Sequence, residues 1–274
     1  MSPDPDAAVR VRGVRVLFGG VAALDRIDLD VVEGEVFVLV GPNGSGKTTL
    51  LNAVSGFVPL AEGSVELFGE DVTRRRAHQR ADRGIGRTFQ SPRALQSARV
   101  TDLLSFGLYR HDPRSWAGEV FRPLRALRLD RQVDERFRTV LDTVGLPDEL
   151  LHEELGSLSH GQMKMVDIAR ALLGEPRVLL LDEPTSGLNQ GEIDKLHEIV
   201  QGLRTGGCTP VLVEHNVQFV VDLADRIAVL HQGELLALGE PRATLSRDEV
   251  VEAYLGPKGR LAHRDGGHQA ETRN

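Results

Sequence analysis

The chain is poor in the features that mark secreted or membrane-spanning proteins. Cys208 is the single cysteine among 274 residues, so no disulfide can form within the chain. No apolar run approaches the roughly 18 residues that a membrane-spanning helix needs. The first ten residues, MSPDPDAAVR, have neither the basic nor the apolar region of a secretory signal. These absences predict a protein that stays in a reducing cytosol.

The chain also has fewer basic than acidic residues. Acidic residues outnumber lysine and arginine by 40 to 33, which gives a formal net charge of −7 at pH 7. A general nucleic-acid binder has a broad basic surface, so this balance argues against one, and no nucleic-acid partner is expected. The hydrophobic fraction of 41% and the charged fraction of 27% are typical of a soluble globular protein.

Strand patterns are prominent in the first third of the chain. Apolar and polar residues alternate, as in half-buried strands, over 9–16, 27–32 and 64–69. The continuously apolar stretch 36–40 predicts a strand buried on both faces, and helical spacing follows from about Gly46 to Val54. The later segment GIGRTF is rich in turn-forming residues.

The rest of the chain divides into a helical stretch and an alternating one. From Ser91 to about Leu155 strand signals disappear and helical spacing recurs, which predicts a helical insertion. Strands and helices then alternate, which predicts a parallel sheet covered on both faces. The tail from Gly256 is polar and glycine-rich, so it is predicted to be disordered. The expected elements are helices over 161–173, 191–204 and 216–224, strands over 177–182 and 210–214, and a hairpin over 226–239.

The stretch GPNGSGKTT follows the buried strand and opens the next helix. It matches the G-x-x-x-x-G-K-[ST] pattern of a phosphate-binding loop, in which glycines let backbone N–H groups point at phosphate oxygens. Lys47 is expected to reach the β- and γ-phosphates, and the Thr48 hydroxyl to bind Mg²⁺. The strand–loop–helix context weighs against a glycine-rich turn with an incidental lysine. The predicted nucleotide-binding residues are Gly41, Pro42, Asn43, Gly44, Ser45, Gly46, Lys47, Thr48 and Thr49.

Two acids end the leucine-rich strand VLLLDE. Ligands of open α/β sheets collect at this edge, so Asp182 is predicted to hold Mg²⁺, directly or through water. Glu183 is predicted to polarise the water that attacks the γ-phosphate. The pair could instead cap the following turn, but the phosphate loop upstream favours the catalytic interpretation.

The stretch LSHGQ lies at the start of the helix predicted over 161–173. Ser159 and Gln162 have the S-x-x-Q spacing of a capping box, which satisfies two backbone donors. A helix N-terminus with an open backbone at Gly161 can also bind a phosphate. The same N–H groups can serve both purposes.

With these motifs in view, residues 9–255 resemble an ATP-binding-cassette (ABC) ATPase. The resemblance implies an α/β P-loop NTPase fold with a mostly parallel core sheet, an N-terminal antiparallel β part and a helical insertion at about 91–158. An extension, 1–8, precedes this domain, and the tail, 256–274, follows it.

The family signature L-S-G-G-Q is similar to LSHGQ here, with a histidine in place of the first glycine. In the family, this helix start faces the ATP of a second subunit, so that two chains enclose two ATP molecules head to tail. The histidine is expected to point away, because a helix N-terminus disfavours an imidazolium. The residues that the resemblance assigns to the signature are Leu158, Ser159, His160, Gly161 and Gln162.

Further residues resemble family motifs in order along the chain. Gln90 resembles the glutamine that senses the γ-phosphate and contributes to the Mg²⁺ site, and His215 the switch histidine that contacts the γ-phosphate. Residues 186–189 resemble the loop that crosses the dimer interface in the family, with Asn189 where many members have Asp. Phe18 stands where an aromatic residue stacks on adenine, and a place in the core is its alternative.

The segments FGG, GRTFQ and EVVEAYLG are most similar to ATP-binding subunits of branched-chain amino-acid importers. This resemblance implies an ATPase at the cytoplasmic face of the membrane, with a second ATPase subunit, identical or different, and two membrane-spanning permeases. An extracytoplasmic substrate-binding protein would deliver the cargo. Residues 91–106 are the expected permease-docking surface, with ordinary core as the alternative.

Other functions are weighed against the importer. The LSHGQ spelling also resembles importers of urea or short amides, so the cargo stays open between these classes. Cassette ATPases that act on DNA or ribosomes carry long coiled coils or two cassettes, and neither is present in this sequence. A metabolic P-loop kinase lacks the signature and switch motifs.

Overall fold

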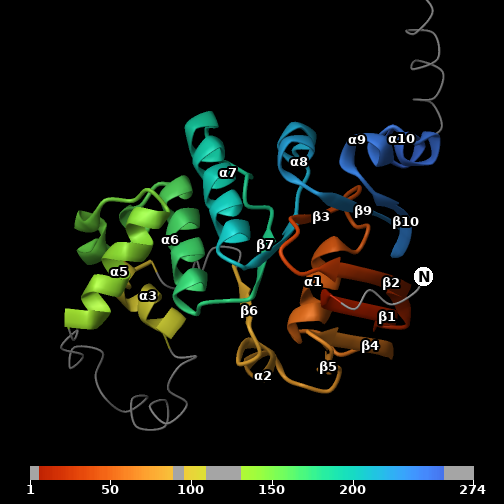
Figure 1. The fold of residues 1–274 in the computed structure, drawn as a ribbon, viewed down its shortest axis with the longest axis horizontal. Coiled ribbons are helices and arrows are strands. Elements are labelled where there is room, and N and C mark those ends of the chain that lie inside the picture. Colours follow the sequence, from red (N-terminus) through yellow and green to blue (C-terminus); the bar gives the residue numbers. More distant parts are fainter. Residues whose placement is uncertain (1–5, 89–95, 109–130, 256–274) are drawn as a thin grey trace, which may run out of the picture.

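Two sheets with helices packed around them make up the molecule (Figure 1). The computed structural model describes residues 6–88, 96–108 and 131–255. The smaller sheet is antiparallel and has the order β2-β1-β4-β5, formed by β1 (Ala7–Phe18), β2 (Val21–Val32), β4 (Glu62–Leu67) and β5 (Glu70–Asp71). The first strand thus begins two residues before the predicted one.

The larger sheet has the order β10-β9-β3-β8-β7-β6 and is parallel except at its β10 edge. Its strands are β3 (Phe37–Val40), β6 (Ile85–Arg87), β7 (Val178–Asp182), β8 (Thr209–Val213), β9 (Arg226–His231) and β10 (Glu234–Gly239). The α/β class with an antiparallel N-terminal part and a mostly parallel core sheet is confirmed.

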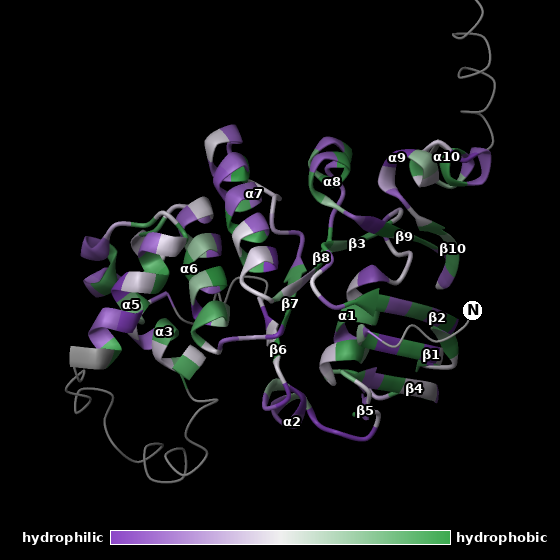
Figure 2. Ribbon diagram, in the orientation of Figure 1, coloured by the Kyte–Doolittle hydropathy of each residue, from purple (hydrophilic) through white to green (hydrophobic). Residues whose placement is uncertain are grey.

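Side chains of β3 divide between the two cores of the protein. Val38 and Val40 point into the core that includes residues of α6 (His160–Leu173), α7 (Gln190–Thr205) and α8 (Val217–Leu223). Phe37 and Leu39 point into the other core, with α1 (Lys47–Ser55) and the smaller sheet. Burial on both faces explains why this strand is continuously apolar. Figure 2 shows mixed hydrophilic and hydrophobic residues along α5 and α7, as amphipathic helices require.

Helices α3 (Val100–Leu108), α5 (Arg131–Thr143) and α6 pack together at one end of the molecule (Figure 1). Leu104, Phe137, Leu141 and Val166 are fully buried between them. Two short 3-10 turns, Asp148–His152 and Leu155–Ser157, lead into α6. The helical character predicted for this stretch is therefore present in its described parts, and α6 packs with it. The last two helices of the described chain are α9 (Pro241–Leu245) and α10 (Asp248–Leu255).

One strand was missed by the sequence analysis. Residues Ile85 to Arg87, inside the segment that was interpreted as turn-rich, form β6 and pair in parallel with β7. The strand has only three residues, which is too short to show an alternating pattern. Gly86 is needed there because a Cβ atom would lie 2.8 Å from a carbon of the Pro176 ring. The glycine that suggested a turn thus permits a close approach.

A buried arginine ties the helix α2 (Ala77–Ala81) to the end of α1. The Arg80 guanidinium donates hydrogen bonds to the carbonyl oxygens of Ala53 and Val54 at 2.7 Å, Thr73 at 3.0 Å and Arg75 at 3.1 Å. The C-terminal carbonyls of a helix carry partial negative charge, which suits a cation. Burial lowers the pKa of Arg80 to about 10, so it stays charged at neutral pH.

The single thiol is buried as well. Burial raises the pKa of Cys208 to about 12, so this side chain stays protonated and unreactive in the folded protein. Within the described ranges, no helix combines the length and the apolar character needed to cross a membrane.

Candidate nucleotide-binding site

The predicted phosphate loop connects β3 to α1 at the carboxyl end of the larger sheet. Gly46, just before α1, has φ 104°, and a Cβ atom there would lie 2.8 Å from both the Ala23 carbonyl oxygen and the Leu24 side chain. Gly41, with φ 146°, lies against the Leu230 carbonyl, where a side chain would clash. These two glycines let the loop fold tightly at the start of the helix.

Lys47 points into this loop. The residue is only 5% exposed, and its ammonium donates hydrogen bonds to the carbonyl oxygens of Gly41 at 2.8 Å and Pro42 at 2.9 Å. Burial lowers the pKa of Lys47, while the nearby carboxylates of Glu183 and Asp182 act in the opposite direction. The loop therefore encloses a cation that is held by neutral carbonyls and can exchange them for phosphate oxygens.

Asp182 ends β7 and faces the first turn of α1. The Thr48 hydroxyl donates to one of its carboxylate oxygens at 3.3 Å, and the Arg87 guanidinium lies 3.4 Å from the other. Burial raises the pKa of Asp182, and the charge of Arg87 opposes that rise. The hydroxyl and the carboxylate thus bring two oxygens together, and hard divalent cations prefer oxygen ligands.

Glu183 forms a close pair with His215. Its Oε1 lies 2.5 Å from His215 Nε2, which joins the ends of β7 and β8. The backbone of Glu183 is left-handed, with φ 48°, an uncommon conformation for a residue with a side chain. The Lys164 ammonium donates to the Glu183 carbonyl at 2.7 Å and so holds this conformation from α6.

Glu214 is a buried residue that the sequence analysis missed. Its carboxylate accepts hydrogen bonds from the Thr185 N–H and hydroxyl, both at 2.8 Å, and from the His215 N–H at 3.1 Å. These hydrogen bonds of Glu214 hold the segment after Glu183 next to the segment that carries His215. An acid at the end of the buried strand PVLVE was the available signal, because such an acid needs internal partners.

Tyr254 of α10 also reaches the phosphate loop. Partial burial raises the pKa of its phenol, and the nearby Gly41 backbone acts in the opposite direction. The helix near the end of the described chain therefore contacts the first glycine of the loop. Nothing in the residue pattern around EAYLG predicted this contact.

The capping box at the start of α6 is confirmed. Ser159 Oγ accepts from the Gln162 N–H at 3.1 Å, and Gln162 Oε1 accepts from the Ser159 N–H at 2.9 Å. The His160 ring packs against Gly187, where a Cβ atom would lie 2.7 Å from its Cδ2. The ring therefore lies on the loop that precedes α7.

The start of α7 lies against the start of α6. Asn189 caps α7, accepting from the Glu192 N–H at 3.0 Å, while the Glu192 carboxylate accepts from the Asn189 N–H at 2.9 Å. That carboxylate is also in contact with Gly161, where any side chain would clash. Asn and Asp are equally good helix caps, so Asn189 fulfils the capping role without a charge.

The predicted residues fall into two groups in space. Lys47, Thr48, Asp182, Glu183 and His215 come together at the carboxyl ends of β3, β7 and β8. The residues of LSHGQ instead lie with the start of α7, as their contacts with 187–192 show. In the part of the chain that the structure describes, no hydrogen bond joins the two groups.

Two predicted residues stand apart from these groups. Phe18 ends β1 and is 53% exposed. The alternative prediction, that its side chain lies in the core, is therefore wrong. Gln90 lies outside the described residues, as does the 91–95 part of the expected docking surface.

The fold and the gathered side chains define a P-loop nucleotide-binding domain of the ATP-binding-cassette type. Residues 24–186 match the family model described as ABC transporter, and the chain belongs to this family. It is therefore a nucleotide-binding protein and an ATPase cassette.

Named relatives align along nearly the whole chain. It is 34% identical over 249 residues to a high-affinity branched-chain amino acid transport ATP-binding protein of Pseudomonas aeruginosa, covering 90% of this chain and 97% of the relative. It is 33% identical over 250 residues to a probable branched-chain amino acid transport ATP-binding protein of Archaeoglobus fulgidus, covering 90% and 95%. A crystal structure of a nucleotide-free ATP-binding cassette from an ABC transporter matches with TM-score 0.82 and 31% identity, covering 91% and 99%.

Proposed function

We propose that this chain is the ATP-hydrolysing subunit of an importer for branched-chain or other hydrophobic amino acids, acting at the cytoplasmic face of the membrane. The convergence of Lys47, Asp182, Glu183 and His215 at one sheet edge is the observation that carries the proposal. The cargo class rests on the names of relatives that are more than 30% identical over 90% of the chain.

ATP would bind with its phosphates in the loop between β3 and α1. The Lys47 ammonium would leave the Gly41 and Pro42 carbonyls for the β- and γ-phosphates. The adenine would stack on the exposed ring of Phe18. Thr48 and Asp182 fit Mg²⁺ because it favours one or two protein oxygens together with phosphates and water, and Gln90 would join them. When bound, the ion neutralises negative charge on the phosphates.

Glu183 would orient the attacking water and accept its proton. The structural support is that its backbone is fixed from two sides, by Lys164 at its carbonyl and through Glu214 at Thr185. His215, paired with Glu183, would contact the γ-phosphate. A carboxylate held in place beside the phosphate loop avoids the cost of ordering it at the moment of reaction.

A second ATPase subunit, identical or different, would complete each site. Ser159 and Gly161 lie at the start of α6 beside the start of α7, and Ser159 is exposed. In a head-to-tail dimer this helix start would face the γ-phosphate of the partner's ATP. ATP would then stabilise the closed dimer by its higher affinity for that arrangement, and hydrolysis would release it.

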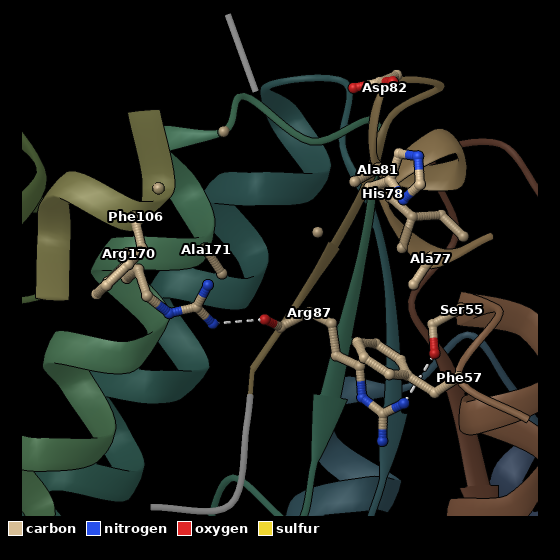
Figure 3. A pocket seen from close by; sticks show the side chains of 14 residues that line it. Ser55, Phe57, Ala77, His78, Ala81, Asp82, Arg87, Phe106, Arg170 and Ala171 are labelled. Atoms are coloured by element: carbon tan, nitrogen blue, oxygen red, sulfur yellow. Dashed lines mark hydrogen bonds between the residues drawn. The ribbon is translucent and has the colours of Figure 1, made fainter. Parts of the chain in front are cut away.

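A permease would dock in the cavity of about 320 Å³ between the core and the helical part of the chain (Figure 3). Its apolar contacts are Phe57, 52% exposed after α1, and Phe106, 53% exposed on α3. Phe106 belongs to the predicted docking segment, whereas the wall formed by Phe57 and α2 was not foreseen. An apolar cavity of this kind suits an amphipathic helix from a membrane protein.

Arg87 connects this cavity to the proposed metal ligand. It lines the cavity beside Phe57, donates to Ser55 Oγ at 2.8 Å, and lies 3.4 Å from Asp182. The Arg170 guanidinium of α6 donates to the Arg87 carbonyl at 2.7 Å and so joins the two walls. A helix docked here would thus lie two side chains away from the phosphate site.

Affinity capture tests the proposal. The tagged Glu183→Gln chain with ATP is expected to bring down two multi-span proteins and a second cassette from detergent-solubilised membranes of its own cell. The Glu198→Gln chain, altered at an exposed acid of α7 that pairs with Lys195, is the matched control and should release them after turnover. Deleting the captured permeases should abolish uptake of branched-chain amino acids. Capture of ribosomes, of DNA or of nothing contradicts the importer assignment.

A further inference from the structure

Three consecutive arginines, Arg74, Arg75 and Arg76, line a second cavity of about 520 Å³. All three are exposed, in the segment between β5 and α2. Other arginines nearby are engaged, since Arg83 pairs with Glu70 at 2.6 Å and Arg80 is bound by backbone carbonyls. Across the described ranges, no ion pair within 4.0 Å is formed by any member of the triplet. Its charges are therefore available to a ligand.

The lining of this cavity has little negative charge to offset the triplet. Glu62 is the acidic residue among its described lining, and the Arg15 guanidinium already donates to that carboxylate at 3.0 Å. Asp71, the acid whose charge is coupled to Arg74, accepts a hydrogen bond from the Thr73 N–H at 2.8 Å. The local charge is thus positive although the whole chain carries −7. Distant charges matter little because screening acts over about 8 Å at physiological ionic strength.

Part of the lining is apolar. Phe57, Val58, Pro59 and Leu60 form one wall, and Phe57 is about half exposed. Guanidinium groups bind phosphate oxygens in bidentate fashion, so the arginine wall selects a phosphate. A free phosphate ion makes no use of an apolar wall, whereas a phospholipid brings a phosphate and hydrocarbon together. The combined chemistry of the cavity favours a lipid.

The orientation of the molecule points the same way, and this step rests on the proposed function. Phe57 lines both this cavity and the permease-docking cavity, so the two are adjacent. A permease that docks beside Phe57 lies in the bilayer, which makes this the membrane-facing side. Figure 1 shows α2 and β5 at the lower end of the molecule and α8, α9 and α10 at the opposite end. The cytoplasmic leaflet carries anionic lipids that attract basic residues near the membrane.

We propose that Arg74, Arg75 and Arg76, with the apolar segment 57–60, form a binding site for the phosphate headgroup of an acidic phospholipid in the cytoplasmic leaflet. The site holds the cassette against the membrane beside its permease. It also makes ATPase assembly sensitive to the lipid composition of that leaflet.

Sedimentation with vesicles tests this inference on the full chain without any permease. Binding is expected to vesicles of phosphatidylcholine mixed with phosphatidylglycerol, to weaken with added salt, and to be absent for phosphatidylcholine alone. Replacing the triplet, R74Q/R75Q/R76Q, should weaken binding on the order of a hundredfold, from about fivefold for each arginine near the surface. Because these side chains are exposed, thermal unfolding should be unchanged, which checks that the variant is folded.

The matched control removes three exposed arginines that do not line this cavity, R204Q/R242Q/R247Q, and should keep wild-type binding. Equal binding of the wild type to both kinds of vesicle, or an equal loss in the control, overturns the inference. Competition by soluble glycerol phosphate as strong as that by vesicles at equal phosphate concentration would reveal a free-phosphate site and also overturn it.

The vesicle assay and the capture experiment can fail separately. Permease capture by Glu183→Gln without vesicle binding removes the lipid site and leaves the proposed function. Binding to acidic vesicles through the triplet without permease capture supports the lipid site and removes the importer assignment.

Discussion

The phosphate-loop end and the signature end of this chain are assembled in different ways. At the phosphate-loop end, Lys47 is buried among carbonyls, and Glu183 pairs with His215 across two strands. At the signature end, the Ser159 hydroxyl caps its own helix and remains exposed. One end brings groups from several strands together, whereas the other presents a single helix start with an exposed serine. The difference is what the proposed head-to-tail dimer requires, because each chain would then supply one half of each of two sites.

The largest effect is expected from removing the cation of the phosphate loop. Lys47→Ala should lower ATP affinity by at least about a hundredfold, because charge-assisted bonds to two phosphates are lost. Titration calorimetry with ATP measures this. Burial lowers the pKa of Lys47, which means that its charge does not stabilise the folded state. The loss of this charge in Lys47→Ala should therefore not lower the melting temperature. Lys195→Ala, at an exposed ion pair on α7, is the control, and normal ATP binding by Lys47→Ala would contradict the phosphate-loop assignment.

Glu183→Gln should separate binding from hydrolysis at the same end. ATP affinity should persist while turnover falls about 10²- to 10⁴-fold, the usual contribution of a positioned base. Phosphate release measures turnover, and size-exclusion chromatography with ATP should detect an accumulated dimer. Normal turnover by this variant would remove Glu183 from its proposed role.

Ser159→Arg tests whether the signature end acts on the other chain. Alone, the variant should lose ATP hydrolysis, because a bulky cation would occupy the place of the partner's γ-phosphate. In a homodimer, mixing it with inactive Lys47→Ala chains should restore hydrolysis, since one intact loop then meets one intact signature. Ser157→Arg, two residues earlier and also exposed, should stay active. Absence of restoration in the mixture would argue that both ends serve the same chain.

The smallest effect is expected from Tyr254→Phe, which removes one hydroxyl near Gly41, the first glycine of the phosphate loop. Loss of its electrostatic interaction with the Gly41 backbone should raise KM for ATP about two- to fivefold and leave kcat nearly unchanged. Steady-state kinetics separates the two parameters. Glu249→Gln on the same helix is the control, and an unchanged KM would show that α10 does not support the loop.

The sequence predicted the elements that carry a long periodic pattern or a contiguous motif. The apolar run of β3, the phosphate loop and the S-x-x-Q cap follow from neighbouring residues. Contacts between residues far apart in sequence could not be predicted this way. Glu214 accepts a hydrogen bond from Thr185, which lies 29 positions away in the sequence. Tyr254 comes close to Gly41 only in the folded chain. The three-residue β6 is too short for any period.

Arg80 has a mechanical consequence for the whole cassette. Its guanidinium holds the last carbonyls of α1, and α2, to which it belongs, lines the docking cavity. The phosphate loop lies at one end of α1 and the carbonyls bound by Arg80 lie at the other. Because a helix of nine residues is only about 13 Å long, the loop and that cavity wall are expected to move as one rigid unit. The opposite wall, on α3 and α6, is joined to it by the hydrogen bond from Arg170 to the Arg87 carbonyl, and α6 is held to the end of β7 by the bonds of Lys164 to the Glu183 and Pro184 carbonyls. We expect a change in the cavity width to move α3 and α6 rather than the α2 wall, because Arg80 fixes that wall to the end of α1.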